Sequence, residues 1–236
     1  MTMIFLTRPE GENESLATLL AKHKVNLLIR PLIELSPIEI DKNTEELLTT
    51  IDQQYAIAFV SKSSVRYALP LLENYWPQWP SDPRWLAVGP GTATELAGFG
   101  IRADYPAVAG SEGLLELPAL LTVSGTKVLI VRGVGGREHL ATSLERRGAQ
   151  VTYLEVYRRS PLENAHWPAV PAGSVIVVTS VEAMGYLSTM AGEAIDRCRF
   201  VVASPRIAAA GNRSWETIIA AGASDRALYD AVLSCL

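Results

Sequence analysis

The sequence is poor in the residues that build metal sites and disulfides. Its 236 residues include two cysteines, Cys198 and Cys235, and three histidines. The cysteines form no CxxC pair, and the histidines (His23, His139 and His166) are far apart in the sequence. A disulfide framework and the usual zinc-ligand spacings are therefore both missing. We expect reduced thiols, no metal and no cofactor, as in a cytoplasmic protein.

Basic charge and long apolar runs are also scarce. The formal net charge is −4, which argues against a nucleic-acid partner because such proteins usually carry a basic face. No apolar run approaches the roughly 18 residues that cross a bilayer. The N-terminus MTMIFLTRPE has no basic region before its short apolar stretch, so no signal peptide is expected. These absences predict a cytoplasmic protein with no membrane partner, and the lack of an apolar surface stripe favours a monomer.

What the chain does have is an internal repeat. Residues 4–37 align without gaps on residues 128–161 and are identical at nine of 34 positions, against roughly two expected by chance. The identical pairs are Arg8/Arg132, Gly11/Gly135, Glu14/Glu138, Leu16/Leu140, Ala17/Ala141, Thr18/Thr142, Leu20/Leu144, Ser36/Ser160 and Pro37/Pro161. Weaker echoes are 58–69 with 176–187 (Ser61 opposite Thr179), 85–97 with 200–212 (Pro90 opposite Pro205) and 109–118 with 222–231.

Apolar runs alternate with amphipathic segments in both halves. The apolar runs are nearly all continuous, as buried parallel strands are. Between them leucines recur at helical spacing, for example Leu16 and Leu20, and Leu140 and Leu144. Strands that alternate with helices predict an α/β fold with two doubly wound parallel sheets of flavodoxin-like type. The expected strands are 3–8, 25–32, 56–61, 84–89, 127–132, 151–157, 174–179, 199–204 and 216–220.

The domain boundaries can be drawn in two ways. A simple division cuts the chain once, near residue 125. However, the segments 28–39 and 153–161 are long, extended and rich in proline at their ends, so each could leave one sheet and enter another. We favour this second plan. Its parts are a discontinuous domain of residues 1–35 plus 160–236, an inserted domain of residues 38–155, and connectors at about 30–38 and 153–161.

The carboxyl ends of the expected strands share a polar character. Ligands of doubly wound sheets bind beyond these ends, and each end precedes a helix whose free N–H groups attract anions. Serine and threonine are also ordinary helix caps, which accounts for any one end taken singly. Together the ends favour an anionic ligand. They are Thr7-Arg8-Pro9, Ser61-Lys62-Ser63-Ser64, Gly89-Pro90-Gly91-Thr92, Arg132-Gly133 with Arg137 beyond it, Thr179-Ser180 and Ser204-Pro205-Arg206.

Residues 132–137, RGVGGR, look like a nucleotide-phosphate turn between a strand and a helix. The dinucleotide fingerprint GxGxxG would need a glycine where Glu138 stands, and this carboxylate would repel a pyrophosphate. No Gly-Lys-Ser/Thr follows, which excludes a Walker A loop. The turn is therefore not a nucleotide site.

Several short motifs, taken in chain order, resemble the uroporphyrinogen-III synthase family. They are TRP after the first strand, PLIELSP, VGPGTATEL, SEGLLELP, VLIVRGVGGREHLATSLERRGAQVTYLEVYRR and VVTSVEAM. The resemblance covers essentially the whole chain and is strongest over residues 127–159. It implies two α/β domains joined by a two-stranded connector, with the first domain built from both chain ends.

The resemblance also implies a lyase activity in haem and sirohaem biosynthesis. The substrate would be hydroxymethylbilane, a small linear tetrapyrrole with eight carboxylates. Loss of water from ring A gives an azafulvene, ring D attacks through its substituted carbon to form a spiro intermediate, and reclosure inverts ring D. Because the bilane also closes unaided to a symmetrical isomer, the enzyme's main task is to select a folded conformer.

The same resemblance makes Tyr157, in the connector segment VYR, the candidate general acid for departure of the hydroxyl as water. Position alone also allows Tyr157 a packing role. The expected carboxylate contacts are Arg8, Lys62, Arg132 and Arg137, the expected hydroxyl donors are Ser61, Ser63, Thr92, Thr179 and Ser204, and Pro9, Gly89, Gly133 and Ser180 complete the expected substrate site.

Two other interpretations remain open. One is a two-domain small-molecule binding protein of the periplasmic type, which closes on an anionic ligand without chemistry; the lack of a signal peptide counts against it. The other is a nucleotide-sugar transferase, which would need residues placed for a diphosphate or a metal. The chain also departs from the family in its last turn, where many members carry threonine and this one has Ile207.

Overall fold

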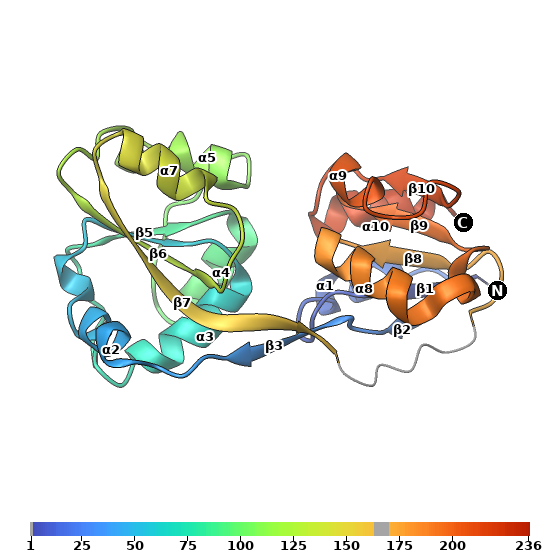
Figure 1. The fold of residues 1–236 in the computed structure, drawn as a ribbon, viewed down its shortest axis with the longest axis horizontal. Helices are drawn as coiled ribbons and strands as arrows, with labels where there is room; N and C mark the ends of the chain where they lie inside the picture. Colours follow the sequence, from blue (N-terminus) through green and yellow to red (C-terminus); the bar gives the residue numbers. More distant parts are fainter. Residues whose placement is uncertain (1, 163–169) are drawn as a thin grey trace. The chain divides into compact units, whose positions relative to one another are not determined.

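The structure is a computed structural model that describes residues 2–162 and 170–236, so His166 lies outside the described residues. The chain divides into two compact units (Figure 1). The discontinuous unit comprises Met1–Leu35 and Ser160–Leu236, and the inserted unit comprises Ser36–Arg159. Each unit is built on its own mainly parallel β-sheet, which confirms the predicted α/β fold class.

The discontinuous unit contains a five-stranded sheet in the order β2-β1-β8-β9-β10. All its paired strands are parallel, and counted along this unit the order is 2-1-3-4-5, as in flavodoxin-like folds. In Figure 1, α8 covers one face of the sheet, and α1 and α10 cover the other. The elements are β1 (Met3–Leu6), α1 (Glu14–Leu20), β2 (Asn26–Ile29), β8 (Val175–Val178), α8 (Val181–Ala191), η2 (Gly192–Ile195), β9 (Arg199–Val202), α9 (Pro205–Ala208), β10 (Glu216–Ile219) and α10 (Asp225–Leu233).

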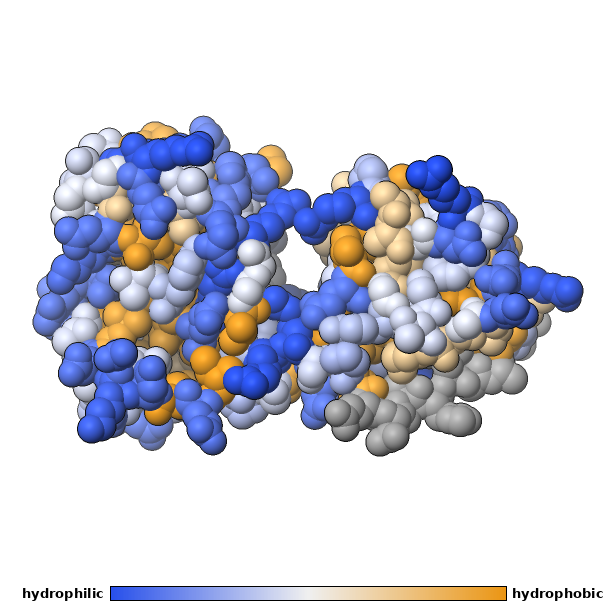
Figure 2. Space-filling view, in the orientation of Figure 1, coloured by the Kyte–Doolittle hydropathy of each residue, from blue (hydrophilic) through white to orange (hydrophobic). Residues whose placement is uncertain are grey.

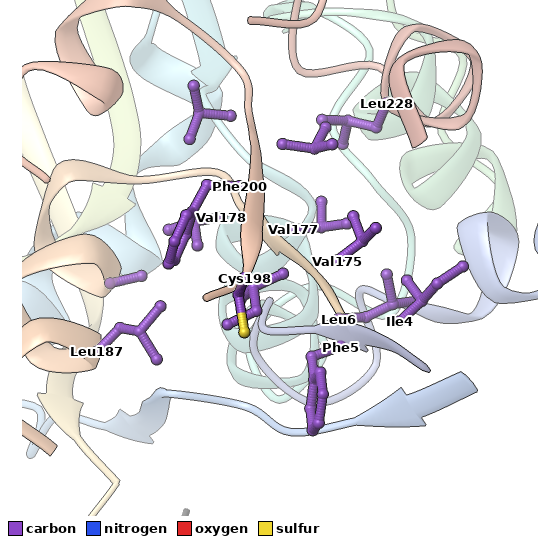
Figure 3. Close-up of a cluster of buried hydrophobic side chains, with 14 of the residues drawn as sticks. Ile4, Phe5, Leu6, Val175, Val177, Val178, Leu187, Cys198, Phe200 and Leu228 are labelled. Atoms are coloured by element: carbon purple, nitrogen blue, oxygen red, sulfur yellow. The ribbon is translucent and has the colours of Figure 1, made fainter. Parts of the chain in front are cut away.

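The core of the discontinuous unit is apolar on both faces of the sheet, which is why its strands read as continuous hydrophobic runs. Successive side chains of β8 point to opposite faces (Figure 3): Val177 lies toward Leu228 of α10, and Val178 toward Leu187 of α8. All four side chains are almost fully buried. Helices on both faces therefore require both sides of the central strands β1, β8 and β9 to be hydrophobic.

The inserted unit contains a second five-stranded sheet, in the order β3-β7-β6-β4-β5. Ala56 and Ala58 face one side and pack with buried residues of α5, α6 and α7. Phe59 faces the other side and stacks on Trp85 with ring centroids 6.0 Å apart. The elements are β3 (Ile33–Pro37), α2 (Lys42–Thr49), η1 (Ile51–Gln53), β4 (Ala56–Phe59), α3 (Lys62–Leu72), β5 (Arg84–Ala87), α4 (Pro90–Gly98), α5 (Ser111–Leu115), α6 (Pro118–Leu121), β6 (Lys127–Gly133), α7 (His139–Arg146) and β7 (Gln150–Pro161).

Strands β3 and β7 connect the two units. The N–H of Ile38 donates to the carbonyl of Val156 at 3.4 Å, and the N–H of Leu162 donates to the carbonyl of Leu32 at 3.0 Å. Moving forward along one strand therefore means moving backward along the other, so this pair is antiparallel. The sequence predicted extended connectors here, and β3 is a strand that the expected set did not include.

The repeat is preserved in the pairing of the strands. Met3 of β1 pairs with Asn26 of β2, and Lys127 of β6 pairs with Gln150 of β7. The sequence alignment makes Met3 equivalent to Lys127, and Asn26 equivalent to Gln150. The two copies of the repeat thus form strand pairs of identical register.

The strand register also corrects one predicted correspondence. Ile4 of β1 pairs with Val175 of β8. The residue that the repeat aligns with Ile4 is Val128 of β6, which pairs with Ala56 of β4. Val175 and Ala56 are therefore equivalent. Counting forward, Ser61 is then equivalent to Ser180. The expected match of Ser61 with Thr179 was wrong by one residue, because short apolar strands can be slid by a residue without changing their composition.

The surface seen in Figure 2 is mainly hydrophilic, with hydrophobic residues in scattered patches. No helix within residues 2–162 and 170–236 is long and apolar enough to cross a membrane. Within the part of the chain that the structure describes, the large hydrophobic side chains that stay exposed are Ile29, Tyr105, Val108, Leu121, Val134, Val181, Ile219 and Leu236.

Candidate active site

The carboxyl ends of β4 and β6, together with residues along β7, border a pocket in the inserted unit, with a cavity volume of about 230 Å³. The ends of parallel strands meet at one edge of a sheet, which brings residues distant in the sequence together. Five residues expected from the sequence line the pocket: Ser61, Arg132, Gly133, Arg137 and Tyr157. The other lining residues are Val60, Ser111, Ile130, Gly135, Gly136, Leu140, Ala141, Tyr153 and Arg159.

The glycine turn after β6 forms one wall of this pocket. Gly135 and Gly136 have φ values of 70° and 111°, in the left-handed region that strains other residues. A Cβ on Gly136 would also lie 2.9 Å from Nη2 of Arg132. The turn thus needs its glycines to wrap around an arginine.

Arg132 lies beneath this turn and is only 5% exposed. Its guanidinium donates to the carbonyls of Gly133 (3.2 Å) and Gly135, and to Oε1 of Glu138 (3.1 Å). Its Cζ also lies 4.5 Å from the ring centroid of Tyr153, a cation–π contact. The sequence predicted a substrate contact for Arg132, whereas its contacts in the structure hold the turn in place.

Glu138 and Tyr153 form a hydrogen bond beside Arg132, in which the phenol donates to Oε2 of the carboxylate. This bond, followed by the contacts with Arg132, lowers the pKa of Glu138. Burial first, and then the hydrogen bond to Glu138, raise the pKa of Tyr153 to about 12. At neutral pH the group is therefore a carboxylate, a neutral phenol and a guanidinium.

The ring of Tyr157 is fixed from several sides. It packs on Tyr67 of α3, with ring centroids 5.3 Å apart and planes at 30°. Gly133 lies directly against it, and the Cζ of Arg159 lies 5.8 Å from its ring centroid. The residue is only 5% exposed, so the tyrosine is packed and also borders the pocket.

The hydroxyl of Tyr157 lies 3.2 Å from Oγ of Ser61, within hydrogen-bond distance. Ser61 is the N-cap of α3, and its Oγ accepts the N–H of Ser64 at 2.9 Å. In return the N–H of Ser61 donates to Oγ of Ser64 at 3.2 Å, a capping box. Helix capping and contact with the tyrosine are thus functions of the same serine.

The remaining expected residues of this unit differ in accessibility. The side chain of Arg137 is 58% exposed, and its Nη1 lies 3.4 Å from Oε1 of the similarly exposed Glu112. Lys62 extends over the start of α4, where a Cβ on Gly91 would lie 2.8 Å from its Cε. Ser63 and Thr92 are buried, and Gly89 is the N-cap of α4. Of the two expected arginines that line the pocket, Arg132 and Arg137, the second is the more exposed.

The other expected residues follow β1, β8 and β9 in the discontinuous unit. Arg8 forms an ion pair with Asp225 and donates to the carbonyl of Ala223 at 2.7 Å. Like its repeat partner Arg132, it makes its contacts within the fold. Pro9 follows Arg8, and Thr179 follows the last residue of β8. Two serines are N-caps of the helices that follow. Ser180 caps α8 by accepting the N–H of Ala183 at 3.0 Å, and Ser204 is the N-cap of α9.

Sequence reasoning missed Ser111, Tyr153 and Arg159 as lining residues. Ser111 lies within the motif SEGLLELP and Arg159 flanks Tyr157, so both were near recognised signals. Tyr153 gave no signal, because only the pairing of β6 with β7 places it over Arg132. No group of three or more potential metal ligands occurs among the described residues.

Chemically, the pocket offers a phenol held at one position, an exposed guanidinium and hydroxyl groups at strand ends. A phenol can donate a proton, and cations and helix N-termini can bind carboxylates. The arrangement suits an anionic substrate that needs a weak acid at one point.

Comparison with known proteins gives consistent results. The sequence model of the family described as uroporphyrinogen-III synthase HemD matches residues 14–229. The uroporphyrinogen-III synthase of Salmonella typhimurium is 33% identical over 248 residues, and that of Escherichia coli (strain K12) is 32% identical over 247 residues; each alignment covers 99% of both proteins. Among solved structures, the uroporphyrinogen-III synthetase of Helicobacter pylori 26695 matches with a TM-score of 0.64 at 16% identity, with both chains fully covered. A mutant uroporphyrinogen III synthase from the extremely thermophilic bacterium Thermus thermophilus has a TM-score of 0.61 at 15% identity, covering 99% of this chain and 97% of its own; these structural matches concern the fold.

Proposed function

Since the chain belongs to the uroporphyrinogen-III synthase family, we propose that it catalyses the dehydrative cyclisation of hydroxymethylbilane with inversion of ring D. The observation that carries the proposal within the structure is that Tyr157 lines the same pocket as the exposed Arg137. A weak acid and a cation are what a polycarboxylate with a leaving hydroxyl group requires.

In the proposed mechanism Tyr157 protonates the hydroxyl of ring A as its bond to carbon breaks. Water leaves, the pyrrole nitrogen keeps its proton and supplies the electron pair that forms the azafulvene as its N-protonated cation, and the tyrosine is left as its conjugate base. Ring D then attacks through its substituted carbon, and the spiro intermediate fragments and recloses. The proton that ring D loses on rearomatisation restores the phenol.

Most of the acceleration is proposed to come from positioning. The bilane closes unaided to the symmetrical isomer, so the pocket must favour the folded conformer in which the substituted carbon of ring D reaches ring A. We therefore expect Tyr157→Phe to lower kcat by about 10²–10³-fold. Unchanged turnover in this variant would remove the acid role and leave Tyr157 with packing alone.

The substrate carboxylates are proposed to bind cations and hydroxyls at the strand ends. Arg137 is the strongest candidate because it is the most exposed of the expected arginines at the pocket. Arg8 and Arg132 are proposed to act indirectly, by fixing the strand ends that they follow. The other proposed contacts are Pro9, Ser61, Lys62, Ser63, Gly89, Thr92, Gly133, Thr179, Ser180 and Ser204, and the pocket adds Ser111 and Arg159.

The function is tested by incubating the protein with freshly generated hydroxymethylbilane and separating the product isomers. The proposal requires the type III isomer in excess over a protein-free control. Formation of the symmetrical type I isomer alone would contradict it. Binding of the bilane without faster turnover would instead favour a non-catalytic binding protein.

We further propose that the protein works as a cytoplasmic monomer and that the two units are its domains. Both cysteines are free and buried, as expected in a reducing compartment. Burial, followed by the charge of Asp196, raises the pKa of the Cys198 thiol to about 11, so this thiol stays protonated and unreactive at neutral pH. Size-exclusion chromatography with light scattering should give the mass of one chain. It should show no additional mass from bound nucleic acid or lipid.

A further inference from the structure

The hydroxyl of Tyr157 contacts a serine whose own position is fixed by a helix end. Ser61 Oγ lies 3.2 Å from the phenol oxygen. It also accepts the N–H of Ser64, while the Oγ of Ser64 donates to the carbonyl of Ser61 at 2.7 Å. These bonds hold the side-chain oxygen of Ser61 in place without using its proton.

The hydroxyl proton of Ser61 is not needed for the bonds with Ser64, so it is available to Tyr157. A hydroxyl has one donor and two acceptor lone pairs. One lone pair of Ser61 Oγ receives the N–H of Ser64. The other can accept the proton of a neutral Tyr157. When Tyr157 has lost its proton, rotation about the Cβ–Oγ bond of Ser61 lets the serine donate instead, with no movement of heavier atoms.

The repeat provides an internal comparison for this serine. Ser180 is at the equivalent N-cap position in the other unit, where it accepts the N–H of Ala183 at 3.0 Å. The residue equivalent to Tyr157 in that unit is Ile33, a buried apolar side chain. Capping therefore explains a serine at both positions, whereas contact with a phenol occurs in the inserted unit.

We propose that Ser61 is a positioning residue for Tyr157 that stabilises its conjugate base during catalysis. The inference rests on the proposed function, in which Tyr157 is the acid. It assigns Ser61 a role beyond the direct substrate contact expected from the sequence. The 11-residue helix α3 adds to the effect, because its N-terminus carries partial positive charge close to the developing phenolate.

The step balances within the groups named. The Tyr157 O–H bond breaks and its proton joins the oxygen leaving ring A, which departs as water. The electron pair of that O–H bond stays on the phenol oxygen. Ser61 then turns its own O–H toward this oxygen, and no proton leaves the serine. When ring D releases its proton to the phenolate, Ser61 returns to accepting.

A double-mutant cycle with freshly generated hydroxymethylbilane tests the inference. The proteins are wild type, Ser61→Ala, Tyr157→Phe and the double variant, each assayed for kcat and KM of type III product. Ser61→Ala is expected to lower kcat about tenfold while KM changes less than about threefold, since a hydrogen bond to a charged group is lost only in the reacting state. In the Tyr157→Phe background the same change should have almost no effect on kcat.

Two further variants separate the hydroxyl from the helix cap. Ser61→Thr keeps the hydroxyl and the helix cap, so its kcat should be within about threefold of wild type. Ser61→Gly removes the hydroxyl, but glycine is a much better N-cap than alanine, so this variant serves if Ser61→Ala folds poorly. Asp41→Ala is the capping control, because Asp41 caps α2 in the same unit by accepting the N–H of Thr44 at 2.8 Å; it should lower the melting temperature and leave kcat unchanged.

The outcomes are distinct. Equal losses of kcat from Ser61→Ala in the wild-type and Tyr157→Phe backgrounds would overturn the inference, as would failure of Ser61→Thr to restore activity. So would a Ser61→Gly variant with full kcat. A wild-type protein that forms no type III isomer would refute the proposed function itself, which is a separate result from a failed cycle.

Discussion

Gly133 lies against the ring of Tyr157 so closely that a Cβ at position 133 would be 2.6 Å from both Cε2 and Cζ of the tyrosine. Gly133 is the last residue of β6, and Tyr157 is its partner on β7, just past a register shift in the pairing. The glycine is therefore required by close packing. The turn that resembled a phosphate loop therefore includes the residue that makes room for the candidate acid.

Gly133→Ala should displace the Tyr157 ring and lower kcat. We expect a loss of about tenfold or more, since small misplacements of reacting groups can cost up to about 10²-fold. Overpacking should also cost about 1–3 kcal/mol of unfolding free energy. The control is Gly98→Ala at the end of α4, where a Cβ would meet no atom within 4 Å. Wild-type kcat in Gly133→Ala would show that the ring position does not matter.

Arg132 and Arg137 are five residues apart yet should respond to substitution in different ways. Arg137→Met should raise KM several-fold with unfolding free energy changed by less than about 0.5 kcal/mol, because its side chain is exposed. Arg132→Met should cost about 2–4 kcal/mol, since it removes a buried charge from its hydrogen-bonded partners. Chemical denaturation and steady-state kinetics measure the two effects. Arg146→Met, at the end of α7, matches the charge change, and an equal rise of KM there would contradict a specific role for Arg137.

The melting temperature of the wild-type protein should fall more steeply with decreasing pH than that of Glu138→Gln. The pKa of Glu138 is lowered in the fold, first by the hydrogen bond from Tyr153. A lowered pKa means that the ionised form stabilises the fold, fully above the ordinary pKa of 4.5 and decreasingly as the pH falls through the folded value. Glu138→Gln should therefore flatten the melting temperature between about pH 6 and 3. Glu145→Gln on the same helix is the control, and parallel curves for Glu138→Gln and wild type would be evidence against this linkage.

The predictable part of the fold was the part encoded by composition and repetition. Continuous apolar runs predicted nine strands, and a strand is present at each, because strands covered on both faces admit few polar residues. The identical leucines of the repeat, including Leu16 and Leu140, are buried as the helical spacing predicted. Strand β3 was missed because it is half-exposed. It also follows β2 without a helix between them and is antiparallel to β7, so it does not fit the alternation of strands and helices. The family resemblance was confirmed by the family model and by the relatives.

The site was harder to predict because a residue type does not reveal what its atoms contact. Arg8 and Arg132 looked like ligands for carboxylates, yet both make their contacts inside the fold. Tyr153 lacked any local signal, since its partners come from the strand and turn beside it. Ser61 was recognised as a helix cap and a hydroxyl, but its contact with Tyr157 joins residues that only the sheet brings together.

Ile207 should be needed for packing, at the position where the family resemblance led us to expect a threonine. It is 3% exposed and belongs to the core of the discontinuous unit. Ile207→Thr would remove apolar volume and bury a hydroxyl, so we expect a loss of about 2–3 kcal/mol in unfolding free energy with no gain in kcat. Ile219→Thr is the matched control, because Ile219 is 48% exposed in β10 and should change stability by less than about 0.5 kcal/mol. An Ile207→Thr variant with wild-type stability and a lower KM would instead place this position in contact with substrate.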